Sequence, residues 1–81
     1  MVNLEELRAN FEAAWPELIA RDKIEHYTGG LYTAATMASY DHRGTGVPNK
    51  VRNGRKVAYP KKELINWIMA RMEAINAKYR Q

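Results

Sequence analysis

KVRNGRKVAYP, residues 50–60, carries the strongest local signal in the chain. Two short runs rich in valine and basic residues flank Asn53-Gly54, a pair that supplies the two positive φ angles of a type I′ turn. The sequence therefore predicts a β-hairpin at this place. With strand pairing centred on that turn, Val51 and Val57 share the inner face, and Arg55 has the same parity near the tip.

Helices are expected on both sides of this hairpin. Behind it, apolar residues at helical spacing predict a long helix over residues 61–79. Ahead of it, Thr33 is a good N-cap for a helix that ends near His42. A shorter helix over residues 21–27 comes before that one and cannot pass Gly29-Gly30, a natural stop followed by a turn.

The N-terminal part of the chain predicts one more helix. Asn3 is a good N-cap for an amphipathic helix that Pro16 ends. Leu18-Ile19 then forms a short apolar step, which we expect in the core. We expect one domain over residues 1–81, made of an N-terminal helix (1–16), a helix-turn-helix (21–43), a hairpin (49–59) and a C-terminal helix (61–79).

Length and composition exclude several classes of protein. A chain of 81 residues is long enough for one small domain and too short for a deep catalytic cavity. The absence of cysteine excludes a disulfide scaffold and thiolate metal sites. No apolar run resembles a signal peptide or a membrane span. These observations predict a soluble protein of the cytoplasm that does not contact membranes.

The positive charge is concentrated in one segment. Residues 1–42 carry three cations and seven anions, whereas residues 43–62 carry seven cations and no anion. Residues 63–81 carry three cations and two anions. A local excess of cations is typical of a surface that binds a polyanion, although a solvated cationic loop has the same composition.

The segment 24–67 resembles the MerR-type winged helix-turn-helix of phage and mobile-element excisionases and AlpA-like regulators. A basic hairpin directly after two helices joined by a glycine turn is the order of elements in that unit. The matching residues are Thr28-Gly29-Gly30, Thr36-Met37, the run Gly54–Pro60, Glu63-Leu64 and Trp67.

The resemblance implies a mostly α-helical fold with a small β-hairpin, a winged helix-turn-helix flanked by N- and C-terminal helices. It also implies that the chain binds double-stranded DNA as a regulator or excisionase-like architectural factor of a phage or mobile element. In this family the wing arginine and polar residues of the recognition helix contact DNA. A homodimer, cooperative assembly on DNA, and contact with an integrase or another phage protein remain open.

The candidate DNA-binding residues lie on the recognition helix and in the basic segment. They are Thr36, Ser39, Arg43, Lys50, Arg52, Arg55, Lys56, Lys61 and Lys62. We expect the arginines of the hairpin to matter most, and the lysines to contact phosphates. The recognition helix carries mainly small residues instead of the Arg, Asn or Gln that read bases, so backbone contacts and DNA shape gain weight.

Catalysis is not expected, and neither is a cofactor or a metal ion. Asp41-His42 and His26 are the sole candidates for acid–base chemistry, and adjacent residues on a helix point about 100° apart. The aromatic residues Trp15, Tyr40 and Trp67 are assigned to the core.

An adaptor that binds another protein through its terminal helices is the alternative function. Three apolar residues of the first helix form a stripe whose mate lies near the C-terminus, within one chain or between two. The two stripes are Leu4, Leu7 and Phe11, and Met72, Ile75 and Tyr79.

Overall fold

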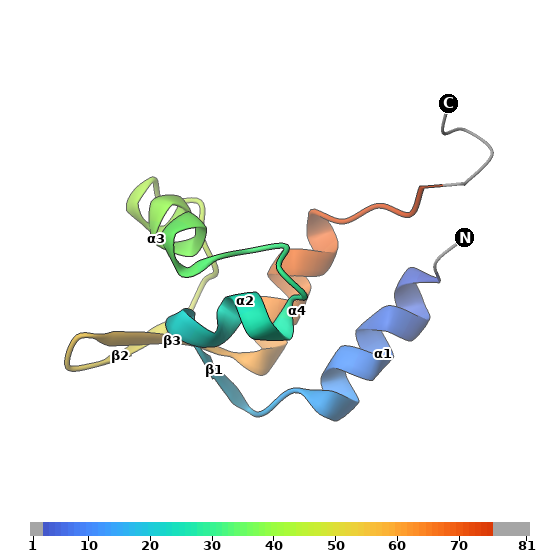
Figure 1. The fold of residues 1–81 in the computed structure, drawn as a ribbon, viewed down its shortest axis with the longest axis horizontal. Coiled ribbons are helices and arrows are strands. Elements are labelled where there is room, and N and C mark those ends of the chain that lie inside the picture. Colours follow the sequence, from blue (N-terminus) through green and yellow to red (C-terminus); the bar gives the residue numbers. More distant parts are fainter. Residues whose placement is uncertain (1–2, 76–81) are drawn as a thin grey trace.

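The fold consists of helices packed around a small antiparallel sheet (Figure 1). It is known from a computed structural model, which describes residues 3–75. The elements are α1 (Leu4–Ala14), β1 (Leu18–Ala20), the 3-10 turn η1 (Arg21–Lys23), α2 (Ile24–Tyr27), α3 (Ala34–His42), β2 (Val51–Asn53), β3 (Lys56–Pro60) and α4 (Lys61–Ala70). The strand order is β1-β3-β2, with both pairs antiparallel.

Strand β1 is a correction to the sequence analysis, which assigned Leu18-Ile19 to the core without pairing it. It pairs with β3 in a register that sets Ile19 opposite Tyr59, and both side chains are fully buried. The three-residue strand is too short for an alternation of polar and apolar residues to reveal it. The hairpin is thereby one part of a three-stranded sheet, with β3 at its centre.

The hairpin forms at the predicted place, but its register differs by one residue. Asn53 pairs with Lys56, so the turn residues are Gly54 and Arg55, and of these two Gly54 alone has a positive φ, +65°. A turn with glycine at its first central position is of type II′, whereas the prediction used type I′. The prediction that Val51 and Val57 share the inner face was also wrong.

Pairing around a two-residue turn places Val51 and Val57 on opposite faces of the hairpin in either register. Arg52, rather than Val51, lies opposite Val57, and Val51 is 45% exposed. The alternating burial of Val57 and Tyr59 fixes which face of β3 is inner, and the turn then decides what β2 places beside them.

Two helices begin at the predicted caps. The Asn3 side chain accepts a hydrogen bond from the backbone N–H of Glu6, and Thr33 accepts one from Thr36, at 3.1 and 3.2 Å. Between η1–α2 and α3 the chain turns at Gly29-Gly30, with φ of +64° and +90°, values that favour glycine.

The C-terminal helix is shorter than predicted. α4 ends at Ala70 instead of continuing to residue 79, and residues 76–79 lie outside the described part of the chain. The guanidinium of Arg71 lies over the rings of Tyr40 and Trp67, at 4.4 and 4.6 Å from their centroids. Arg71 has φ −103° and ψ 3°, outside the helical region, and residues 72–75 that follow are not helical.

The two apolar stripes of the termini meet within one chain. Leu4, Leu7 and Phe11 of α1 line the same groove as Met72 and Ile75. Tyr79, the last residue of the predicted mate, lies outside the described residues. α1 and α4 lie side by side, and Arg8 Nη1 donates a 2.7 Å hydrogen bond to Asn66 Oδ1 across them.

The core lies between the inner face of the sheet, α2, α3 and α4. Its buried residues are Trp15, Ile19, Ile24, Met37, Val47, Val57, Tyr59, Leu64, Ile65 and Ile68. Trp15 is in the core as expected, whereas Tyr40 and Trp67 are half-buried. None of the helices within residues 3–75 combines the length and the apolar character that crossing a membrane requires.

Candidate functional site

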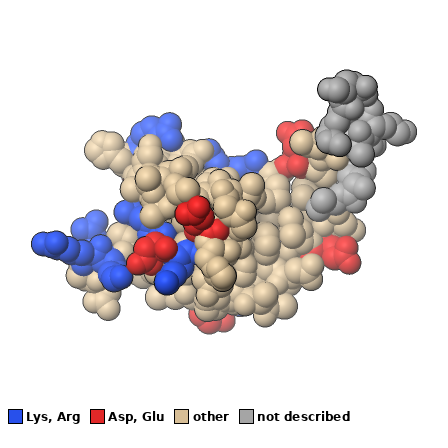
Figure 2. All heavy atoms as spheres, in the orientation of Figure 1, with Lys and Arg blue, Asp and Glu red and all other residues tan. Residues whose placement is uncertain are grey.

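Cations gather at the end of the molecule formed by the hairpin. Figure 2 shows Lys and Arg side chains over the tip of the β2–β3 hairpin and beside it over α3, while Asp and Glu are visible in the middle of the view, next to some of these cations, and toward the end formed by α1. The hairpin cations are Lys50, Arg52, Arg55 and Lys56, and all four residues are exposed. The structure therefore brings together four of the predicted site residues.

The cations of the basic segment differ in how far other groups already engage them. Lys56 Nζ lies 3.1 Å from Asp22 Oδ2, in a pair that is exposed on both sides and therefore contributes little to stability. Within residues 3–75, Arg52, Arg55 and Lys62 form no ion pair.

Lys61 lies elsewhere. Its ammonium donates a 2.9 Å hydrogen bond to the carbonyl of Glu12, near the end of α1, and lies 3.8 Å from Glu17. A cation is stabilising at that end of a helix. Lys61 thus joins α4 to α1 and does not extend the hairpin surface.

The outer face of α3 carries the other predicted residues. Thr36, Ser39 and Arg43 are exposed, and Arg43 lies over the ring of Tyr40, 4.9 Å from its centroid. The hydroxyl of Thr36 is held by a 3.0 Å hydrogen bond from Thr33. This face offers hydroxyl groups and one cation.

A polar cluster that the sequence did not reveal attaches α3 to the sheet. Arg21 Nη2 donates to Asp41 Oδ2 at 2.5 Å, and Arg21 Nε donates to the phenol oxygen of Tyr59 at 3.0 Å. That phenol in turn donates to Asp41 Oδ2 at 2.8 Å. The three residues come from η1, α3 and β3, so the cluster fixes the position of α3 relative to the sheet.

The other oxygen of the Asp41 carboxylate, Oδ1, has a different environment from Oδ2. Asp41 is 8% exposed at its side chain, and its Oδ1 accepts no hydrogen bond from any residue in 3–75. The nearest cation is Lys50, whose Nζ lies 3.7 Å from that oxygen and 3.2 Å from the carbonyl of Val47. Asp41 thus links α3 also to the loop that leads into β2.

The environment of Tyr59 predicts a pH dependence of stability. Burial raises the pKa of its phenol to about 12, against the opposing effect of the Arg21 guanidinium and with the help of the Asp41 carboxylate. An unfolded tyrosine ionises near pH 10. Because the folded state favours the protonated phenol, its contribution to stability is complete below pH 10 and is lost as the pH rises toward 12.

We expect the free energy of unfolding of the wild type to fall, between pH 9 and 11.5, more steeply than that of Tyr59→Phe. The difference should reach on the order of 2 kcal/mol. Urea unfolding followed by circular dichroism at several pH values measures it. Both proteins carry the same lysines, so lysine titration cancels in the comparison. Parallel curves for the two proteins would contradict the prediction.

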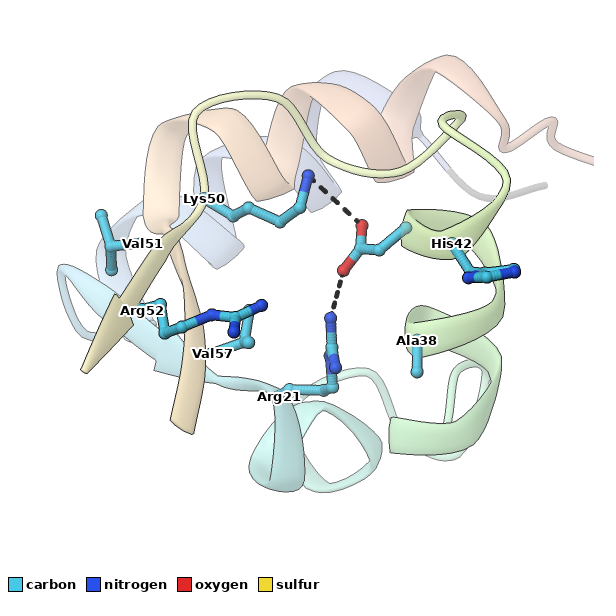
Figure 3. Close-up of a pocket in the computed structure, with 8 residues that line it drawn as sticks. Arg21, Ala38, His42, Lys50, Val51, Arg52 and Val57 are labelled. Atoms are coloured by element: carbon cyan, nitrogen blue, oxygen red, sulfur yellow. Dashed lines mark hydrogen bonds and ion pairs between the residues drawn. The ribbon is translucent and has the colours of Figure 1, made fainter. Parts of the chain in front are cut away.

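A pocket of about 380 Å³ opens between α3 and the hairpin. Figure 3 shows its walls: side chains from η1, α3 and β2 converge on the space, with Lys50 and Arg52 directed into it from the hairpin side. We call it the helix–hairpin pocket. Its lining residues are Arg21, Ala38, Asp41, His42, Lys50, Val51, Arg52 and Val57.

An aromatic cluster holds the other side of α3. The rings of Tyr32, Tyr40 and Trp67 lie with centroids 5.1 to 6.5 Å apart, a range in which such pairs attract. Trp67 Nε1 also donates to the carbonyl of Thr45 at 3.1 Å. Met37 is the single fully buried side chain of α3, so this helix relies on polar and aromatic contacts.

Arg21, Asp41 and Tyr59 escaped the sequence analysis because they lie 18 to 38 residues apart in the chain. Asp41 was considered only as an orienting partner for His42. A usable signal was present in Tyr59, whose phenol needs a hydrogen-bonding partner once strand alternation places it on the inner face beside Val57.

Comparisons with protein-family models, with curated proteins and with solved structures find no match to this chain.

Proposed function

We propose that this chain binds double-stranded DNA as a winged helix-turn-helix, with α3 as the recognition helix and the β2–β3 hairpin as the wing. The observation that carries the proposal is the gathering of Lys50, Arg52, Arg55 and Lys56 on a hairpin beside the exposed polar face of α3 (Figure 2). A helix and a two-stranded ribbon are the two elements that enter DNA grooves.

The distribution of charge supports a polyanionic partner. Residues 43–62 hold seven cations and no anion. Of these cations, Lys61 is used within the fold, and Lys56 is paired only at the surface. Arg52 and Arg55 form no ion pair within residues 3–75, so a ligand explains the gathering of cations on the hairpin better than the fold does.

The chemistry of α3 favours backbone contacts over base reading. Its outer face offers the hydroxyls of Thr36 and Ser39 and the guanidinium of Arg43. Hydroxyl groups discriminate poorly among bases, whereas bidentate Arg, Asn and Gln discriminate well. We therefore propose a protein that recognises DNA largely through phosphates and groove shape, consistent with a regulator or architectural factor of a mobile element.

We expect binding to a mixed-sequence duplex of about 20 base pairs to weaken steeply with salt. Engagement of four to five cations gives a slope of about −4 in a plot of log K against log salt concentration, at roughly 0.9 per neutralised phosphate. Fluorescence anisotropy with labelled duplex measures it. An acidic protein of similar size serves as the control ligand, and the absence of salt-dependent duplex binding would refute the proposal.

The alternative is an adaptor that binds another protein. An apolar groove between α1 and residues 72–75 favours it, with Leu31 64% exposed and Ile75 62% exposed at its edge. This groove lies away from the hairpin (Figure 1). Binding to the acidic control protein at the strength found for DNA would favour the adaptor.

A further inference from the structure

The helix–hairpin pocket has the charge of an anion site. Three cations line it, Arg21, Lys50 and Arg52, against the single carboxylate of Asp41. That carboxylate lies beneath the surface, 8% exposed, whereas the side chain of Lys50 is 38% exposed and residue Arg52 is exposed. An arriving ligand therefore meets cations first.

The three cations are not equally available. Arg21 is committed to Asp41 and Tyr59 through two hydrogen bonds. Lys50 Nζ donates one hydrogen bond, of 3.2 Å, to the carbonyl of Val47 and lies 3.7 Å from Asp41 Oδ1, so its other hydrogens are available to a ligand. Arg52 makes no hydrogen bond or ion pair with any other residue in 3–75, although the register of the hairpin turns it toward the inner face beside Val57 (Figure 3). Arg52 belongs to β2 and Lys50 is the residue just before β2, so both side chains face the helix–hairpin pocket from the same side.

The rest of the lining indicates what kind of anion fits. Ala38, Val51 and Val57 supply small apolar surfaces. His42 is the one aromatic ring in the lining, and it points away from the space that Lys50 and Arg52 enter (Figure 3), so a base finds no platform to stack on. The volume of about 380 Å³ is at the lower end for small-ligand sites, and the pocket is open to solvent. A phosphate group with its sugar edges suits this space better than a nucleobase does.

We propose that the helix–hairpin pocket binds a single phosphodiester of the DNA backbone, which Lys50 and Arg52 hold jointly. The inference rests on the proposed function: between the groove that receives α3 and the groove that receives the hairpin, one backbone strand has to cross this pocket. Asp41 does not touch the phosphate. It positions Arg21 and Lys50 at the base of the pocket, leaving Arg52 to close on the anion from the hairpin.

Joint binding of one phosphate has a measurable signature in the salt dependence. The double variant Lys50→Gln/Arg52→Gln should reduce the magnitude of the salt slope by about 0.9, the value for one phosphate. The charge-matched double variant Arg43→Gln/Arg55→Gln removes two cations from separate elements, the end of α3 and the hairpin tip, so it should reduce the magnitude of the slope by about 1.8. Gln keeps a polar end and part of the aliphatic stem in both variants, and thermal unfolding confirms that both fold.

The outcomes separate this inference from the proposed function. Equal slope reductions of about 1.8 for both double variants would show that Lys50 and Arg52 hold different phosphates, and would overturn the inference while leaving DNA binding intact. No change of slope in the Lys50/Arg52 variant would likewise overturn it. A wild-type protein without salt-dependent duplex binding would refute the proposed function, and the inference with it.

Discussion

Gly46→Ala should destabilise this protein by about 3 kcal/mol, although it adds one methyl group. A Cβ at Gly46 would overlap Oδ1 of Asp41 and lie 2.9 Å from its Cγ and 3.1 Å from its Cα. The Cα belongs to α3 and cannot yield without moving the helix. The carboxylate would have to leave Arg21 and Tyr59, so the cost combines overpacking with the disruption of a buried ion pair.

The expected loss is large relative to the free energy of unfolding of the whole domain. A domain of this length has a free energy of unfolding of roughly 4–12 kcal/mol, so the variant would lose a large part of it. Urea unfolding followed by circular dichroism measures the change. Gly46 has no positive φ, so the requirement for glycine at this position is the lack of space for a Cβ.

Two further variants test the cause. Gly44→Ala has open space around its Cβ but a φ of +79°, so it should cost about 1 kcal/mol through backbone strain alone. The double variant Asp41→Ala/Gly46→Ala removes the obstructing carboxylate but keeps the close contact with the Cα, so Gly46→Ala should cost clearly less in the Asp41→Ala background than in the wild type. If Gly46→Ala proves no more harmful than Gly44→Ala, the close approach of Gly46 to Asp41 does not constrain the fold.

Arg55→Gln should weaken binding to duplex DNA by about 1–3 kcal/mol, roughly 5- to 150-fold. Arg55 is at the tip of the hairpin, follows Gly54 in the turn, and forms no ion pair within residues 3–75. A guanidinium so placed is free to enter a narrow minor groove, whose negative potential attracts it. Binding isotherms at one fixed salt concentration measure the effect.

The matched control is Arg8→Gln. Arg8 carries the same charge but lies on α1, where it bonds to Asn66 of α4. Both variants lower the net charge by one, so a difference between them reports position and not overall charge. Equal affinities for the two variants would refute the assignment of the hairpin tip to DNA contact.

Much of the secondary structure could be predicted because its signals are local. Asn3 and Thr33 cap α1 and α3 as their side-chain chemistry predicts. Gly29-Gly30 separates two helices because both residues adopt positive φ values, which favour glycine. The place of the hairpin was also predicted, since Asn53-Gly54 favours a tight turn in either of two registers.

What could not be predicted depends on distant contacts. The pairing of β3 with β1 sets Tyr59 opposite Ile19, 40 residues earlier in the chain. Arg71, which follows the last residue of α4, stacks on Tyr40, 31 residues earlier in the chain. Apolar periodicity alone cannot reveal either contact. It shows which residues of one helix or strand share a face, and not which residues of other elements pack against that face.

The candidate site, too, could be predicted from local signals only in part. Its exposed cations were evident from the composition of residues 43–62. The helix–hairpin pocket was not, because it needs Arg21 and Asp41 from the acidic half of the chain. The distribution of charge along the sequence locates a basic surface. The fold is needed to show that Asp41 holds Arg21 and Lys50 in place.

The sparse apolar attachment of α3 has a consequence for motion. With Met37 as its one fully buried side chain, this helix has fewer buried side chains than α4, which buries Leu64, Ile65 and Ile68. We therefore expect α3 to open at a lower free energy than α4. We expect this opening to respond more to salts, which weaken ion pairs, than to solvents that weaken apolar contacts.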